Sequence, residues 1–126
     1  MRPATLAEVA ALTAEGDSFD RYLANFLDEF YATPNAAALT PVPALLAPLQ
    51  GDIGHVADAY LAATAEDLAQ RFELSLPGWT YGEERQLHRP WFASDLSSLR
   101  AVLILESPAA FRSRNLFVSE NALSRV

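Results

Sequence analysis

The strongest constraint on the fold of this chain is a regular run of apolar and aromatic residues between positions 19 and 31. Its members recur at the i, i+3, i+4 and i+7 spacing of one helix face, and they are Phe19, Tyr22, Leu23, Phe26, Leu27, Phe30 and Tyr31. Core packing explains a stripe this rich in aromatic rings better than a ligand site does. The chain is therefore expected to fold around this helix.

The residues before position 19 predict a shorter first helix. Thr5 and Glu8 have the spacing of a capping box, and apolar residues follow at near-helical intervals until Gly16. Asp17 or Ser18 is then expected to cap the aromatic helix, because both side chains can accept a hydrogen bond from a first-turn amide.

A third helix of roughly twenty residues is predicted from a cap at Asp52 to the break at Leu76-Pro77-Gly78. Its apolar stripe is Ile53, Val56, Ala57, Tyr60, Leu61, Leu68 and Phe72. Small residues would let a neighbouring helix approach closely, and they are Ala59, Ala62, Ala63 and Ala65. The segment 33–51 is rich in proline and too apolar for a flexible linker. We expect it to be a packed crossover, with short helices beginning at Pro34 and Pro43.

A fourth helix, capped by Ser94 or Asp95, is predicted to run to position 106. The apolar run at 102–105 would also suit a buried strand, because short apolar runs are ambiguous. A helix is favoured, since leucines before the run keep helical spacing and no second strong strand is available to pair with it. After an extended segment at 116–118, a last helix is expected from Ser119.

Length and composition agree with these elements. The chain has 126 residues, of which 51% are hydrophobic and 20% charged, as in an ordinary folded protein. We predict an all-α fold: a single compact domain over residues 1–126, with about five or six helices and a proline-rich crossover. The sequence has no apolar run of 18 residues, no signal-peptide pattern at its N-terminus and no cysteine, so no membrane segment is expected and the expected location is cytoplasmic.

The charge is unevenly divided along the chain. Residues 1–70 hold ten acids and two arginines, a net of −8, whereas residues 71–126 hold seven arginines and six acids, a net of +1. A protein this acidic is repelled by a nucleic-acid backbone unless one face is locally basic. Nucleic acid is therefore an unexpected partner, and only the C-terminal part could supply such a face.

No residue pattern points to catalysis, a metal or a cofactor. His55 has no second ligand one helical turn away, and His88 has only Glu83 and Glu84 before it, whereas a metal needs three or four converging ligands. The sequence contains no phosphate-binding glycine loop and no serine nucleophile elbow. An enzyme with an irregular site around His88, Glu83 and Glu84 stays an open but unmotivated alternative.

The C-terminal part supplies the candidate binding residues. Arg112 and Arg114 flank a turn after Ser107-Pro108, and Asn115 suits the left-handed position that ends a helix. We expect one of the two arginines to be structural, paired with Glu106 or with a helix C-terminus, and the other to be exposed. Trp79 and Trp91 flank a basic stretch with Arg85 and Arg89 and could stack on nucleic-acid bases, although a small satellite core explains them better. The candidate partner-binding residues are Trp79, Arg85, Arg89, Trp91, Phe92, Arg112 and Arg114.

The segments PWF, ESPAAFRSRN and LFVSENALSR, within residues 90–125, resemble the C-terminal region of a small group of bacterial proteins. No activity is assigned to that group, so the resemblance transfers no catalytic residue. It implies at most an antitoxin-like or partner role.

These observations predict a non-enzymatic protein that binds another protein or associates with itself. A narrower expectation is an acidic, antitoxin-like partner of a basic protein, with the acidic half steering the encounter and the aromatic C-terminal surface making the contact. The alternative is a small nucleic-acid-binding or regulatory module that uses Arg85, Arg89, Arg112 and Arg114.

Overall fold

A computed structural model of the chain describes residues 2–125 and shows a mostly α-helical fold. Within these residues the α-helices are α1 (Leu6–Ala14), α2 (Phe19–Ala32), α3 (Ala47–Gln50), α4 (Asp52–Arg71), α5 (Arg100–Glu106) and α6 (Ala109–Arg112). The 3₁₀ helices are η1 (Ala36–Ala38), η2 (Gly78–Tyr81), η3 (Glu83–Arg85) and η4 (Ser97–Leu99). Two short strands complete the fold, β1 (Trp91–Phe92) and β2 (Leu116–Phe117). The predicted all-α class is confirmed.

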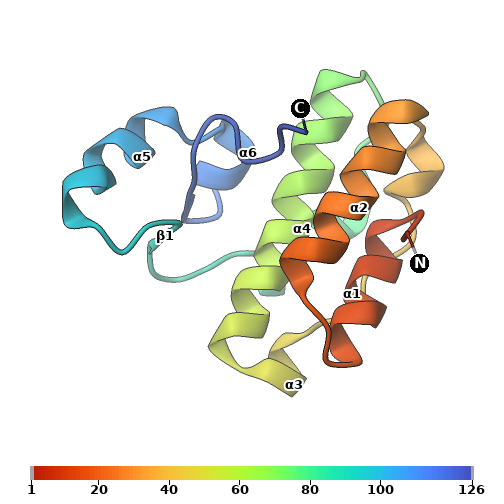
Figure 1. Cartoon of the computed structure of the whole chain (residues 1–126), viewed down its shortest axis with the longest axis horizontal. Helices are drawn as coiled ribbons and strands as arrows, with labels where there is room; N and C mark the ends of the chain where they lie inside the picture. Colours follow the sequence, from red (N-terminus) through yellow and green to blue (C-terminus); the bar gives the residue numbers. More distant parts are fainter. Residues whose placement is uncertain (1, 126) are drawn as a thin grey trace.

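The helices α1, α2 and α4 form a bundle that holds most of the core (Figure 1). The caps predicted for α1 and α2 are present, because the hydroxyl of Thr5 accepts from the Glu8 amide and that of Ser18 from the Arg21 amide. The caps predicted at Asp52 and at Ser94 or Asp95 are absent, because α4 and α5 begin after Gly51 and Leu99 without a side-chain cap. The aromatic stripe of α2 faces inward, with Phe26 and Phe30 buried and their rings stacked at 5.8 Å. The helix predicted most clearly from the sequence thus directs its aromatic side into the bundle.

The long helix α4 lies at the centre of the molecule, and its small residues are buried as predicted. Two expectations about it are wrong. It ends at Arg71 rather than at Leu76, because Glu73 adopts a positive φ of 55°. Ile53, placed in its buried stripe, is exposed.

The crossover between α2 and α4 packs on the bundle, but its helices begin later than expected. The helix η1 begins at Ala36, with Asn35 as its cap, rather than at Pro34. Pro43 is followed by residues without regular secondary structure, so that α3 begins only at Ala47. The carboxylate of Asp58, on α4, accepts hydrogen bonds from the Leu46 and Ala47 amides at 2.7 and 3.0 Å. A side chain from a neighbouring helix therefore caps α3.

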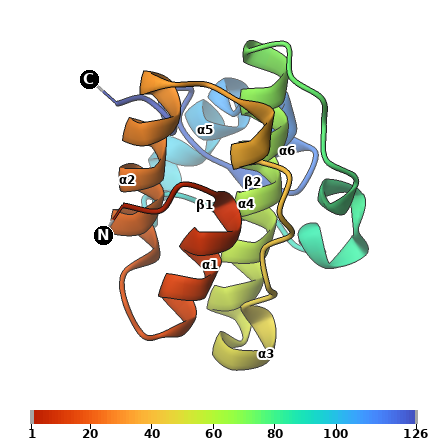
Figure 2. The same ribbon diagram turned by 90° about the vertical axis from the view of Figure 1, so that its right-hand side faces the viewer.

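The C-terminal part forms a second layer beside α4, with α5 lying farthest from the bundle (Figures 1 and 2). Residues 102–105 are helical as predicted, although the helix begins at Arg100. The segment at 116–118 is extended as predicted, but its partner was missed: β1 pairs with β2 in parallel, Trp91 opposite Leu116.

The last helix expected from Ser119 does not form within the described residues. The segment after β2 runs as turns along α2. The Tyr31 hydroxyl donates to the Leu123 carbonyl at 2.8 Å, and Arg125 pairs with Asp28 at 3.0 Å. These contacts to side chains of α2 fix the segment in a non-helical course.

Candidate functional site

The most unusual surface of the molecule lies on α5 and on the residues just before it. Five large apolar side chains are exposed there, and they are Leu96, Leu99, Val102, Ile104 and Leu105. We call this set the α5 face. The most exposed of them, Leu105, is 82% exposed. Folded monomers seldom expose this many large apolar side chains on one short element unless another molecule covers them.

Few interactions hold α5 to the rest of the molecule. Leu103 is the single buried residue among its seven, and no side chain caps its N-terminus. At its other end the hydroxyl of Ser107 donates to the Leu116 carbonyl at 2.8 Å, which ties the helix to β2. A helix this short is marginal in water on its own. Its order therefore depends on whatever packs against it.

An apolar groove of about 520 Å³ lies between the first turns of α2 and α4 and the strand β1. Its apolar walls include Phe19, Ile53, Val56, Tyr60 and Trp91. Burial raises the pKa of Tyr60 to about 12, so this phenol stays neutral at physiological pH. The volume falls in the usual range for pockets that receive apolar groups.

One charge accompanies each of these two surfaces. Arg100 begins α5, and its guanidinium lies 5.1 Å from the centre of the Phe92 ring. Asp20 borders the groove from α2. Within residues 2–125 neither Arg100 nor Asp20 makes an ion pair. An exposed cation on α5 and an exposed anion at the groove are therefore both available to a partner.

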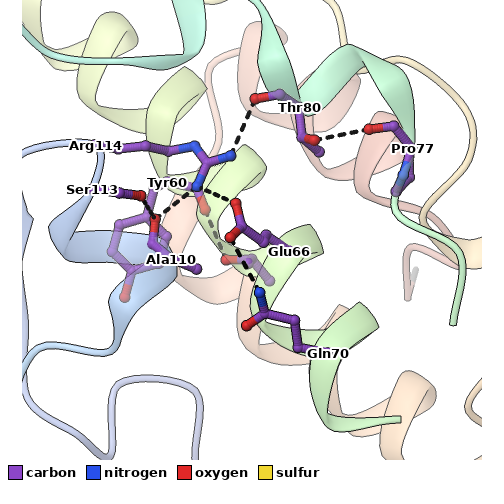
Figure 3. A network of polar contacts seen from close by, with 9 residues as sticks. Tyr60, Glu66, Gln70, Pro77, Thr80, Ala110, Ser113 and Arg114 are labelled. Carbon is purple, nitrogen blue, oxygen red and sulfur yellow. Dashed lines mark hydrogen bonds and ion pairs between the residues drawn. The ribbon is translucent and has the colours of Figure 1, made fainter. Parts of the chain in front are cut away.

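Arg114, proposed from the sequence as a binding residue, is buried instead (Figure 3). Its guanidinium pairs with Glu66 at 2.8 Å and donates to the Ala110 and Thr80 carbonyls at 2.7 and 3.1 Å. It joins α4, η2 and α6 and is closed to a partner. The expected split between a structural and an exposed arginine is present. The structural one pairs with Glu66 rather than with Glu106, and its bond to the Ala110 carbonyl of the short helix α6 agrees with the expected contact to a helix C-terminus.

Arg85 is also buried, which corrects its assignment to a partner surface. Its side chain is 2% exposed, lies 3.9 Å from the carboxylate of Asp58 and donates to the Pro43 carbonyl at 2.6 Å. Its guanidinium also stacks over Trp79, 4.9 Å from the ring centre. Burial lowers the pKa of Arg85, and the charge of Asp58 opposes that shift. This arginine fastens the crossover to α4.

The other proposed residues have mixed positions. Arg89 and Arg112 are exposed, and Arg112 donates to the Ser107 carbonyl at 3.3 Å. Trp79 and Trp91 are partly buried against the main core rather than forming a satellite core, and Trp79 donates to the Leu39 carbonyl at 3.0 Å. Phe92 stacks on Phe117 of β2 at 5.1 Å. Of the proposed set, Trp91 borders the groove.

The two histidines lie near each other without forming a metal site. His55 and His88 are 6.4 Å apart between ring centres and border a pocket of about 360 Å³, whereas Glu83 and Glu84 are not among its lining residues. The Nε2 of His55 lies 2.9 Å from the Gln86 carbonyl, and His88 is exposed. Across residues 2–125, no three potential ligands converge as a metal ion requires.

The α5 face itself was missed at the level of sequence. The run at 102–105 is apolar on every side of a short helix, and that was a usable signal, because such a helix must be buried on all sides. From the sequence the run is interpreted as a helix or a buried strand, whereas in the structure Leu103 is the one buried residue of α5.

Within residues 2–125, no helix combines the length and apolar composition needed to cross a membrane. Comparisons of the chain with protein-family models, with curated proteins and with solved structures give no match.

Proposed function

We propose that this chain is a protein-binding domain that docks another polypeptide through the α5 face. The observation that carries the proposal is an apolar helix with a single buried residue. Covering the exposed side chains would remove apolar area from water, and each fully buried leucine or valine contributes about 1.5–3 kcal/mol. A partner would also supply the packing that so short a helix lacks.

The positions of the arginines weigh against nucleic-acid binding. Two of the four arginines considered for that role, Arg85 and Arg114, are buried in internal ion pairs. Arg89 and Arg112 alone remain for phosphate contact on a chain whose net charge is −7, and phosphate binding usually requires several clustered cations.

An antitoxin-like role toward a basic protein is a narrower proposal, supported by the net charge of −8 over residues 1–70. Exposed acids steer a basic partner, and salt screens that attraction. If this role holds, affinity for the basic partner falls steeply between low and physiological ionic strength. An affinity that does not change with salt would leave the apolar contact alone as the basis of binding.

Site-directed photo-crosslinking in the cells that naturally produce the protein tests the docking surface. A photoreactive amino acid replaces Leu105 in one variant and Val42 in the other; both residues are exposed and apolar, at 82% and 65%, but Val42 lies on the crossover. We expect one defined polypeptide to be cross-linked from position 105 and not from position 42. Equal labelling from both positions, or none from position 105, would refute the proposal.

A further inference from the structure

We propose that the polypeptide bound by the α5 face is a second copy of this chain, and that the groove between α2, α4 and β1 receives it. This inference rests on the proposed function, since it names the partner of the same surface. It requires complementary apolar surfaces, an arrangement in which two copies can close on each other, and matching charge.

The first requirement is met by the groove. Its apolar walls include Phe19, Val56 and Trp91, and its volume of about 520 Å³ is large enough for several apolar side chains. Ile53, at its edge, is 77% exposed although it belongs to the otherwise well-buried helix α4. The molecule thus presents an apolar helix and an apolar groove, and each lacks a covering layer.

The second requirement concerns the relative position of the two surfaces. Ala93 borders the groove and leads through residues 94–99 into α5, so that one short segment connects groove and helix. In Figure 1, α5 extends sideways from the bundle while α2 and α4 begin at its lower end. The arrangement that we propose relates two copies by a twofold axis and places each α5 in the other's groove. Such a reciprocal contact is closed and buries two equivalent patches.

The third requirement is met by two opposite charges that form no internal ion pair. Arg100 begins α5 and Asp20 borders the groove, and neither forms an ion pair within residues 2–125. In the reciprocal arrangement Arg100 of each copy approaches Asp20 of the other. A salt-sensitive ion pair at the edge of an apolar contact fixes its register and excludes other alignments.

Sedimentation equilibrium of the full chain up to about 100 µM tests the inference. We expect a dimer that dissociates on dilution. Leu105→Glu and Ile53→Glu should each weaken dimerisation by about 100-fold or more, because each change occurs twice in a twofold interface. Val42→Glu, an equally drastic change at an exposed site outside both surfaces, should leave the dimer intact. Circular dichroism confirms that each variant is folded.

A charge exchange distinguishes this docking mode from other dimers. Arg100→Asp and Asp20→Arg should each weaken the dimer by roughly tenfold, and the double variant should recover most of that loss. A dimer that is indifferent to changes in the groove, or a double variant weaker than both single ones, would overturn the proposed mode.

A chain that stays monomeric at about 100 µM would overturn the inference without touching the proposed function. In that case the photo-crosslink from position 105 would still join α5 to a different polypeptide. If position 105 gives no adduct at all, the proposed function itself fails.

Discussion

The helices α4 and α5 are both rich in apolar residues, yet they differ sharply in what covers them. Eleven of the twenty residues of α4 are buried, whereas only Leu103 is buried among the seven of α5. The helix α4 is covered by α1, α2 and the C-terminal segments, and α5 lies at the edge of the molecule (Figure 1). Apolar content therefore predicts burial in general, but it does not tell whether the covering layer belongs to the same chain.

The two regions also differ in how their helices begin. The bundle helices α1 and α2 have side-chain caps from Thr5 and Ser18, which satisfy amides of the first turn. The helix α5 begins after η4 with no side-chain cap. Local interactions therefore stabilise α1 and α2, whereas α4 and α5 both lack a side-chain cap. The helix α4 is held by its buried contacts, and α5 depends on few tertiary contacts and on any partner.

The largest expected effect comes from removing the buried carboxylate of Asp58, which pairs with Arg85. Asp58→Ala removes the carboxylate that caps α3 and leaves the Arg85 guanidinium without its anion. Removing one partner of a buried ion pair costs about 3–5 kcal/mol, so the free energy of unfolding should fall by that amount in urea titrations. Asp52→Ala, at the exposed start of α4, which also carries Asp58, should lower the free energy of unfolding by less than about 1 kcal/mol. Equal losses in the two variants would contradict the assigned role of Asp58.

Much of the bundle could be predicted because its signals are local. The stripe from Phe19 to Tyr31 and the caps at Thr5 and Ser18 depend on residues within a few positions, and so does, outside the bundle, the positive φ of 64° at Asn115. Helical periodicity and capping chemistry operate over this range, and the sequence displays them directly.

The remaining features depend on contacts that sequence spacing does not encode. Arg85 and Arg114 looked like surface cations, but their anionic partners, Asp58 and Glu66, lie on α4, far away in the sequence. The strand β1 has two residues and forms only because β2 lies beside it. The groove likewise combines four separate segments, within residues 18–20, 50–60, 91–93 and 118–122, so only the folded chain reveals it.

An intermediate effect is expected within α5 itself, where Leu103 is buried and Leu105 is exposed. Leu103→Ala should lower the free energy of unfolding, either of the whole protein or of α5 alone, by about 2–3 kcal/mol, because Leu103 is the residue of α5 that is buried against the body. Leu105→Ala should change the stability of the monomer by less than about 0.5 kcal/mol. Hydrogen exchange of α5 amides, measured at a concentration where the chain is monomeric, checks both values. A large loss in Leu105→Ala under these conditions would mean that the α5 face is covered within the chain.

The smallest expected effect lies where the C-terminal segment meets the bundle. The hydrogen bond from Arg125 lowers the pKa of Asp28 below its ordinary value of 3.8 in the folded protein. The unfolded chain therefore binds this proton more readily, and the stabilisation is complete above about pH 4 and lost as the pH falls through the lowered folded pKa. The urea midpoint of Asp28→Asn should consequently fall less than that of the wild type between about pH 5 and pH 2. Because the pair is largely exposed, the difference should be small and should shrink further in salt. Identical acid profiles for the two proteins would show that the ion pair does not hold the segment, leaving that role to the Tyr31 hydrogen bond.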